Sequence, residues 1–259
     1  MKVGFIGAGN MATGIARGLA AASGEPGAPA AMVFADATPG RAEEVAGEVG
    51  GEAAGSNRAV ADATDLVVLA VKPNVLDEVA PDLVEPGTPV ISILAGTPVG
   101  ALQRALPGIE VVRVMPNLGA QLRQAVLCVV YPQGLSAGVR ERAAGLLELL
   151  GEVVEVEEEL IDAATALMGC SPGYLALMAE ALVEAGVDEG LSEDQALRMV
   201  ARSMEATGAL LEHHRPEDLK RAVASPGGMT EAGLEALEAR SLRETLREAV
   251  DASLERARG

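Results

Sequence analysis

Two glycine-rich segments carry the residues whose types and spacing suggest chemistry. The first, residues 7–12 (GAGNMA), has the G-x-G-x-x-A spacing that dinucleotide-binding proteins place between a strand and a helix. Its first glycine permits a tight turn, its second lets a pyrophosphate approach the backbone, and its alanine permits close helix–strand packing. A phosphate would lie on the free amides at the positive end of the helix. The sequence therefore predicts a dinucleotide site, with a ligand-free glycine-rich turn as the alternative.

A carboxylate follows at the end of the next predicted strand. In dinucleotide-binding proteins the ribose-binding acid usually follows the glycines by about 20 residues. The interval from Gly7 to Asp36 is longer, and a Pro- and Gly-rich loop at residues 23–29 can accommodate the extra residues. A carboxylate here would accept hydrogen bonds from ribose hydroxyls and repel a 2′-phosphate, which favours NADH over NADPH. Two alternatives stay open: Arg41 could meet a 2′-phosphate, and Asp36 could be a solvated turn residue.

The second glycine-rich segment, residues 225–230 (SPGGMT), lies between two helical patterns. Thr230 is close to a predicted helix start, so the amides of Gly228, Met229 and Thr230 would form a receptor for a carboxylate. The Thr230 hydroxyl could donate to, or accept from, a ring nitrogen. These groups suit a cyclic imino acid, which has a carboxylate beside a C=N bond. The alternative is a structural turn between two helices, capped by Thr230.

The composition excludes several other classes of site. Of 259 residues, 49% are hydrophobic but only 2% are aromatic, and the formal net charge is −18. Stacking sites for single-stranded nucleic acid need aromatic rings, and binding to a phosphate backbone needs clustered Lys and Arg. With two Cys and two His in the whole chain, we expect no metal site. We expect Cys128 and Cys170 to be free thiols in or near the core.

The N-terminal apolar residues superficially resemble a signal peptide. Gly7, Asn10 and Arg17 interrupt them, which argues against that interpretation. No apolar run reaches the length of about 18 residues that a membrane-spanning helix needs. We therefore expect a soluble, cytoplasmic protein with neither a membrane nor a nucleic-acid partner.

The elements that must position these segments fall into two groups. Near-continuous apolar runs at 3–6, 31–35, 66–71, 90–94 and 111–114 alternate with helical patterns at 11–22, 41–49 and 75–84. Such runs are typical of strands buried on both faces of a parallel sheet. The alternation predicts a Rossmann-type, doubly wound α/β domain. Two further strands are expected at 125–130 and 153–156, around a helix at 138–150.

After residue 157 the strand-like runs stop and helical periodicity continues to the C-terminus. Ser192 and Gln195 form a predicted capping box at one helix start. We predict a dinucleotide-binding domain at residues 1–157 and an all-helical domain at residues 158–259. The excess of Leu and Ala in the second domain predicts a face buried against another subunit, in a homodimer or a larger homo-oligomer.

Four motifs occur in an order that points to a family. They are FIGAGNMA at residues 5–12, AVKP at 70–73, RVMPN at 113–117 and SPGGMT at 225–230. Together they resemble pyrroline-5-carboxylate reductase over the full length of the chain, and SPGGMT is the most specific of them. The resemblance implies that the first domain holds NAD(P)H and that the helical domain forms an intertwined dimer. It also implies hydride transfer to the protonated cyclic imine of 1-pyrroline-5-carboxylate, which gives L-proline in the last step of proline synthesis.

The motifs and the resemblance together assign candidate site residues. The candidate cofactor-binding residues are Gly7, Ala8, Gly9, Asn10, Met11, Ala12, Asp36, Asn57, Ala70, Val71, Lys72, Pro73, Ala95 and Gly96. The candidate substrate-binding residues are Ser225, Gly227, Gly228, Met229, Thr230, Met115 and Asn117, with Thr230 as the catalytic candidate. Asn57, Ala95 and Gly96 rest on the resemblance alone. Lys72 could be a phosphate or proton partner or an exposed strand-end residue, and residues 115–117 could line the nicotinamide pocket or form only a turn.

The chain departs from the family pattern at two places near the expected nicotinamide and substrate. Leu118 and Gly119 replace a usual Thr-Pro, and residues 169–174 are GCSPGY where the family usually has Gly-Ser/Cys-Gly-Pro-Ala-Tyr. A reductase of a different cyclic imino acid and a non-catalytic dinucleotide-binding protein are therefore alternatives. A β-hydroxyacid dehydrogenase would need a catalytic Lys early in its second domain, and the sequence has no Lys between Lys72 and Lys220.

Overall fold

The structure is a computed structural model that describes residues 1–85 and 87–258. The chain divides into two compact units: the first comprises Met1–Cys170 and the end of the chain from Ala257, and the second spans Ser171–Arg256. These units are groups of residues that pack together, and they need not coincide with domains. The predicted domain boundary between residues 157 and 158 therefore stays a prediction.

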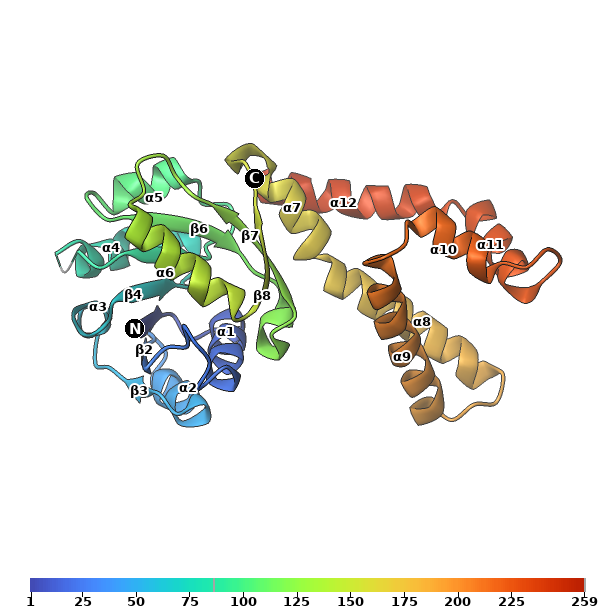
Figure 1. Ribbon diagram of the computed structural model, residues 1–259, viewed down its shortest axis with the longest axis horizontal. Helices are drawn as coiled ribbons and strands as arrows, with labels where there is room; N and C mark the ends of the chain where they lie inside the picture. The colour runs from blue at the N-terminus through green and yellow to red at the C-terminus, as the bar shows by residue number, and fades with distance from the viewer. Residues whose placement is uncertain (86, 259) are drawn as a thin grey trace. The chain divides into compact units, whose positions relative to one another are not determined.

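One eight-stranded sheet forms the centre of the first unit (Figure 1). The strands are β1 (Lys2–Ile6), β2 (Ala31–Ala35), β3 (Glu52–Ala53), β4 (Leu66–Leu69), β5 (Val90–Ser92), β6 (Val111–Met115), β7 (Ala125–Val130) and β8 (Gly151–Glu155). Their order is β3-β2-β1-β4-β5-β6-β7-β8, and every neighbouring pair is parallel except β6 with β7. Because the chain moves outward from β1 to β3 and then crosses back to β4, the topological switch point lies between β1 and β4.

Helices cover both faces of this sheet and form a separate hydrophobic cluster on each. One cluster includes residues of α1 (Asn10–Ala21), α2 (Arg41–Val49) and α6 (Ala137–Glu148); the other includes residues of α3 (Asn57–Ala63), α4 (Leu76–Val84) and α5 (Val99–Ala105). Within β1, Phe5 packs in the first cluster, where its ring stacks on Phe34 with centroids 4.8 Å apart, and Ile6 packs in the second. Burial on both faces explains why the strands are almost continuously apolar. The predicted doubly wound fold is confirmed.

The sheet differs from the sequence prediction at its two edges. β3 has only two residues, and both are exposed, so no apolar run marks it in the sequence. β8 begins at Gly151, two residues earlier than predicted, because Gly151 already pairs with Ala125 of β7. Short 3-10 turns complete the first unit: η1 (Pro73–Val75), η2 (Leu118–Leu122) and η3 (Glu158–Leu160).

A buried arginine joins the sheet to α7 (Ile161–Met168). Arg113 in β6 is 3% exposed, and its Nη1 donates to Glu158 at 3.1 Å while its Nη2 lies 3.8 Å from Asp162. Glu158 also accepts the backbone amide of Val99, at the start of α5, at 2.5 Å. One carboxylate therefore ties β6, α5 and η3 together, which explains why α7 packs with the first unit.

The second unit is helical throughout its described elements. These are α8 (Ser171–Asp188), α9 (Glu193–Leu211), α10 (Pro216–Val223), α11 (Met229–Ala239) and α12 (Leu242–Arg258). The predicted capping box is confirmed, since the Ser192 hydroxyl accepts the Gln195 amide and the Gln195 side chain accepts the Ser192 amide. Tyr174 in α8 donates to the carbonyl of Ala249 in α12 at 3.2 Å. Within the described part of this unit Ala196 is the only buried residue, so most of its hydrophobic side chains face outward.

One helical stretch carries enough apolar residues to resemble a membrane span. The stretch Glu158–Asp188 passes the length and composition test with a mean hydropathy of 1.4, and only 6% of the tested window is buried. This finding corrects the expectation that no segment reaches the necessary length. A helix that packs against another protein chain passes the same test, because both environments select apolar side chains.

Gly18 lets α1 approach η2 closely. A Cβ at this position would lie 2.1 Å from the carbonyl oxygen of Ala120. We expect Gly18→Ala to lower the free energy of unfolding by about 1–3 kcal/mol, because the backbones must move apart. The matched control is Gly47→Ala in α2, where a Cβ would meet no described atom within 4 Å; this variant should be neutral or more stable by up to about 1 kcal/mol. Urea denaturation measures both, and equal stability of Gly18→Ala and wild type would contradict the close contact.

Candidate active site

A cleft of about 560 Å³ opens at the carboxyl ends of β1, β2 and β4. The predicted cofactor residues that line it are Gly7, Gly9, Asp36, Asn57, Ala70, Val71 and Lys72. The predicted cofactor residues that do not line it are Ala8, Asn10, Met11, Ala12, Pro73, Ala95 and Gly96. The structure thus brings residues from four segments of the chain to the edge of the sheet where ligands bind in open α/β folds.

The glycine turn leaves room for a phosphate at the start of α1. Gly7 has a φ of +92°, and a Cβ there would lie 2.7 Å from the carbonyl oxygen of Ala70, so the position requires glycine. Gly9 is the N-cap of α1, and a Cβ on it would meet no described atom within 4 Å. No side chain among the described residues caps this helix, so its first-turn amides are available to an anion. These features fit the pyrophosphate of a dinucleotide.

Asp36 is bonded to the glycine turn rather than freely solvated. One of its carboxylate oxygens accepts the Ala8 amide and the other accepts the Thr38 amide, each at 2.7 Å. Partial burial raises the pKa of Asp36, but these two hydrogen bonds and the charge of Arg41 outweigh burial and hold the pKa below its ordinary value. The carboxylate is therefore ionised at neutral pH, and each oxygen keeps a lone pair for a ribose hydroxyl.

One part of the cleft wall was not predicted from the sequence. It is formed by Ala54, Gly55 and Ser56 after β3, by Val75 of η1, and by Glu78, Val79 and Asp82 of α4. The segment after β3 could not be anticipated, because β3 itself was not predicted. Glu78 and Asp82 carried a usable signal, since residues four apart lie on the same face of a helix.

The segment after β6 is held by its own hydrogen bonds. Met115 is 5% exposed and packs in a hydrophobic cluster. The side chain of Asn117 donates through Nδ2 to the carbonyl of Met168, and its Oδ1 accepts the backbone N–H of Gly119, each at 3.1 Å. A Cβ at Gly119 would lie 2.4 Å from the carbonyl oxygen of Gln124. The Leu-Gly departure from the family pattern therefore fits this turn, because Gly119 provides both the space and an N–H that proline lacks. A substrate contact by Met115 or Asn117 stays a prediction.

Residues 225–228 of the SPGGMT segment lie in the turn between α10 and α11, and residues 229 and 230 begin α11. Gly228 is the N-cap of α11, so the alternative in which Thr230 caps this helix is wrong. The Gly228 amide donates to the carbonyl of Ser225 at 2.9 Å, which corrects the prediction that this amide is free. Met229 and Thr230 are the first two residues of α11, where amides lack acceptors within the helix. These two amides are the part of the predicted carboxylate receptor that the fold leaves available.

A carboxylate of the protein itself already lies in this turn. The Gly227 amide donates to Oε2 of Glu231 at 2.6 Å, and Glu231 is in the first turn of α11. The turn therefore accommodates a carboxylate on a backbone amide, beside the two amides that we assign to the substrate. The sequence analysis did not anticipate Glu231, although an acid four residues after a loop glycine is a visible signal.

The remaining titratable candidates show no catalytic arrangement in the described part of the chain. Cys128 is buried, which raises the pKa of its thiol, and Cys170 is half-buried; both are free, as predicted. His213 and His214 are exposed just after α9. Among the described residues no three His, Cys, Asp or Glu side chains come together as a metal-binding group would require.

Comparison with known proteins gives relatives that span the whole chain. The chain is 36% identical to the pyrroline-5-carboxylate reductase of Thermus thermophilus, over 99% of this chain and 97% of the relative. It is also 36% identical to the enzyme of that name from Pseudomonas aeruginosa, over 99% and 95% of the two chains. This chain belongs to the pyrroline-5-carboxylate reductase family.

Family models and solved structures extend this assignment to both units of the reductase. Residues 158–259 match the model described as pyrroline-5-carboxylate reductase dimerisation, and residues 2–96 match NADP oxidoreductase coenzyme F420-dependent. The solved Plasmodium falciparum pyrroline carboxylate reductase with NADP bound has a TM-score of 0.89 at 27% identity, over 100% of this chain and 97% of that one. The Streptococcus pyogenes 1-pyrroline-5-carboxylate reductase has a TM-score of 0.88 at 31% identity, over 100% and 98%. The resemblance predicted from four motifs is confirmed.

We expect Asp36 to stabilise the fold of this reductase only while it is ionised. Because the pKa of Asp36 in the folded protein is below that in the unfolded chain, about 3.9, its contribution is complete above about pH 5. The contribution is lost as the pH falls through the lowered pKa. Asp36→Asn should therefore be less stable than wild type at pH 7, and the difference should shrink below about pH 4. Urea denaturation between pH 7 and pH 3 measures this difference; a constant difference over the whole range would contradict the assignment.

Proposed function

We propose that this chain reduces 1-pyrroline-5-carboxylate to L-proline and that it uses NADH in preference to NADPH. The proposed reaction is supported by two features that occur together in this member of the reductase family. One is a glycine-turn cleft that fits a dinucleotide, and the other is a turn that already holds a carboxylate on a backbone amide. A bound dihydronicotinamide supplies the hydride.

The contribution of the protein to this reaction is orientation. The substrate imine readily carries a proton near neutral pH, which makes its carbon electrophilic. One hydride adds to that carbon, and the nitrogen keeps its proton as it becomes a secondary amine. We assign the amides of Met229 and Thr230 to the substrate carboxylate and the Thr230 hydroxyl to the ring nitrogen. The reaction then needs no His, Cys or Lys as acid or base, which agrees with the absence of such an arrangement among the described residues.

The charges around the cleft support the preference for NADH. Asp36, Glu78 and Asp82 all line it, and Lys72 is the one Lys or Arg among its lining residues in the described chain. A 2′-phosphate would add negative charge beside these carboxylates, and each close pair of unit charges costs about 1 kcal/mol even in water. NADP in the Plasmodium falciparum structure is bound to a protein that is 27% identical, so it does not decide the preference of this chain.

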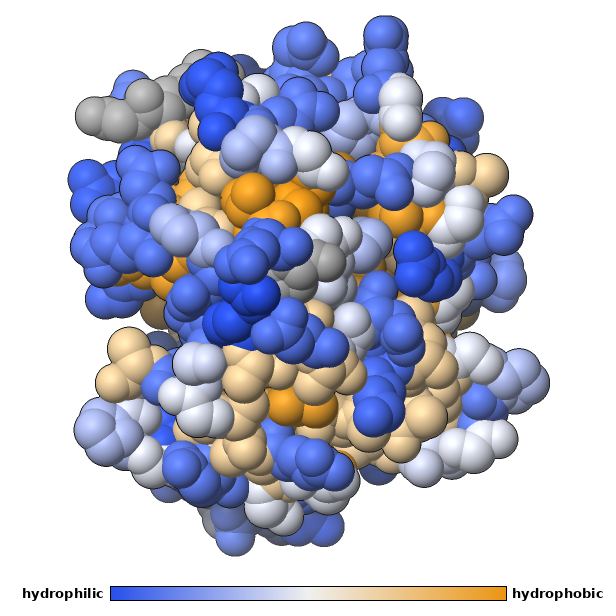
Figure 2. Space-filling view, turned by 90° about the vertical axis from the view of Figure 1, so that its left-hand side faces the viewer, coloured by the Kyte–Doolittle hydropathy of each residue, from blue (hydrophilic) through white to orange (hydrophobic). Residues whose placement is uncertain are grey.

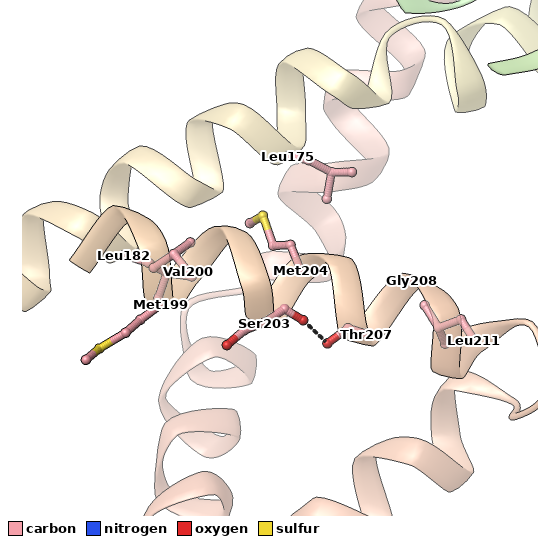
Figure 3. Close-up of a pocket in the computed structure, with 9 residues that line it drawn as sticks. All are labelled: Leu175, Leu182, Met199, Val200, Ser203, Met204, Thr207, Gly208 and Leu211. Carbon is pink, nitrogen blue, oxygen red and sulfur yellow. Dashed lines mark hydrogen bonds between the residues drawn. The ribbon is translucent and has the colours of Figure 1, made fainter. Parts of the chain in front are cut away.

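We infer that the chain works as a homodimer built through its helical unit. Leu175, Leu182 and Met199 are each at least half exposed and line an apolar groove of about 480 Å³ between α8 and α9 (Figure 3). On the face in Figure 2, by contrast, strongly hydrophobic residues form only small areas between polar ones. Monomeric proteins rarely leave large apolar surfaces open. The match of residues 158–259 to a dimerisation model supports a second copy as the cover.

The same interface supports the proposed cytoplasmic location. A helix that packs on a second subunit accounts for the exposed apolar stretch Glu158–Asp188 without a membrane. The excess of 38 acidic over 20 basic residues, which gives the net charge of −18, also disfavours attachment to an anionic lipid surface.

The proposed function is tested directly by turnover. Purified protein with 1-pyrroline-5-carboxylate should oxidise both NADH and NADPH, measured by the loss of nicotinamide absorbance, with a several-fold higher kcat/KM for NADH. No oxidation of either cofactor would contradict the function. A higher kcat/KM with NADPH would contradict only the cofactor preference, and faster reduction of a cyclic imino acid with a larger ring would replace the substrate.

Glu231 should weaken the binding of the substrate carboxylate. Its own carboxylate occupies the Gly227 amide next to the proposed receptor, and it adds a negative charge there. We expect Glu231→Gln to lower KM for the imino acid about two- to fivefold, as about 1 kcal/mol of repulsion is removed, with kcat nearly unchanged. The control is Glu235→Gln, which makes the same charge change one turn later in α11. Equal KM values for the two variants would contradict this role of Glu231.

A further inference from the structure

The two backbone polar groups of Ala8 in the glycine turn are both held by side chains. Its N–H donates to the Asp36 carboxylate at 2.7 Å. Its carbonyl oxygen accepts Nε of Arg41 at 2.8 Å and the hydroxyl of Thr13 at 3.3 Å. Ala8 is fully buried, so these side chains take the place of water at both polar groups.

Arg41 is the centre of this network. It is the first residue of α2, and its Nη2 donates to the hydroxyl of Thr13 at 3.0 Å while its Nη1 donates to Glu44 at 2.8 Å. Nε and Nη2 form one edge of the planar guanidinium, so a single rigid fork spans Ala8 in the turn and Thr13 in α1. Thr13 is 3% exposed, which places this end of the fork inside the protein.

The turn needs such a restraint because of its own sequence. Ala8 stands between Gly7 and Gly9, and glycine gives the backbone more conformational freedom than any other residue. Rotation of the Ala8–Gly9 peptide, whose carbonyl Arg41 and Thr13 hold, would change the direction in which the following amides face. A turn that is held in one conformation before binding avoids the entropy cost of ordering it when the ligand arrives.

We propose that Arg41 is a positioning residue that fixes the glycine turn for NADH and NADPH alike, and that it is not a receptor for a 2′-phosphate. Its bidentate edge is already used by Ala8 and Thr13, and Glu44 compensates its charge at the third nitrogen. Arg41 is also not among the residues that line the cleft. The proposal rests on the proposed function only in that the cleft binds a dinucleotide.

The test measures cofactor affinity without substrate, so it does not depend on turnover. In Arg41→Ala the dissociation constants of NADH and NADPH, measured by titration calorimetry, should rise by the same factor, about tenfold for the loss of hydrogen bonds to a charged group. Arg41→Lys keeps the charge but lacks the fork, so it should not restore affinity for either cofactor. Thr13→Val should also raise the dissociation constants of NADH and NADPH, and it should raise both by the same factor, as Arg41→Ala does.

Arg17→Ala is the matched control. Arg17 also joins α1 to α2, through Glu48, but within the described residues its side chain makes no hydrogen bond to the glycine turn. This variant should bind both cofactors as wild type does. If Arg41→Ala is too unstable to purify, Thr13→Val alone carries the test.

Three results would overturn the proposal. The first is a loss of NADPH affinity with NADH affinity unchanged, and the second is recovery of NADPH binding in Arg41→Lys; both are expected of a phosphate receptor. The third is unchanged affinity for both cofactors in Arg41→Ala or, where that variant cannot be purified, in Thr13→Val. If wild-type protein binds both cofactors but reduces no imino acid, the proposed function fails while the role of Arg41 is still measured.

Discussion

The turn at Gly7 is the constraint on which the first unit depends. Its amide donates to the carbonyl of Ala35 in β2 at 2.9 Å, while its α-carbon passes so close to Ala70 after β4 that a side chain would not fit. The chain therefore leaves β1 in close contact with the segments that follow both neighbouring strands, and this contact positions the start of α1. Gly18 then brings the same helix against η2, behind the end of β6. One rigid helix thus connects the phosphate end of the cleft to the segment that follows β6.

The sequence predicted those parts of the fold whose stability is local or repeats along the chain. Strands buried on both faces must be apolar at every position, so the central strands were visible as runs. β3 was not, because its two exposed residues depend on pairing with β2 at the edge of the sheet. The cleft wall at Ala54–Ser56 was missed for the same reason. Arg113 was visible as a charge within an apolar run, but its partner Glu158 lies 45 residues away and only the fold reveals it.

The candidate site shows a similar division. Glycine spacing predicted both turns and the type of ligand group that each would bind. Glycines have no side chain, so they allow tight turns and let an anionic group approach the backbone amides. Which amides remain free is a property of the folded turn. The Gly228 amide bonds to the Ser225 carbonyl and the Gly227 amide bonds to Glu231; the spacing of Glu231 hints at its bond, but only the folded turn shows that both amides are used. A sequence can indicate an amide-lined receptor, but the hydrogen bonds inside the turn decide how many donors it offers.

The charge of the chain explains why these backbone details matter. The expected cofactor and substrate are both anions, whereas the protein carries a formal net charge of −18. Salt screens distant charges beyond about 8–10 Å, so the local donors at the helix N-termini decide whether an anion binds. Among the described residues that line the cleft, Lys72 is the one Lys or Arg, so the donors there are mainly backbone amides. A backbone amide binds an anion only when its N–H points at it. Side chains that fix the backbone, such as Asp36 and Arg41 at Ala8, therefore contribute what a more basic protein obtains from lysines in direct contact with the ligand.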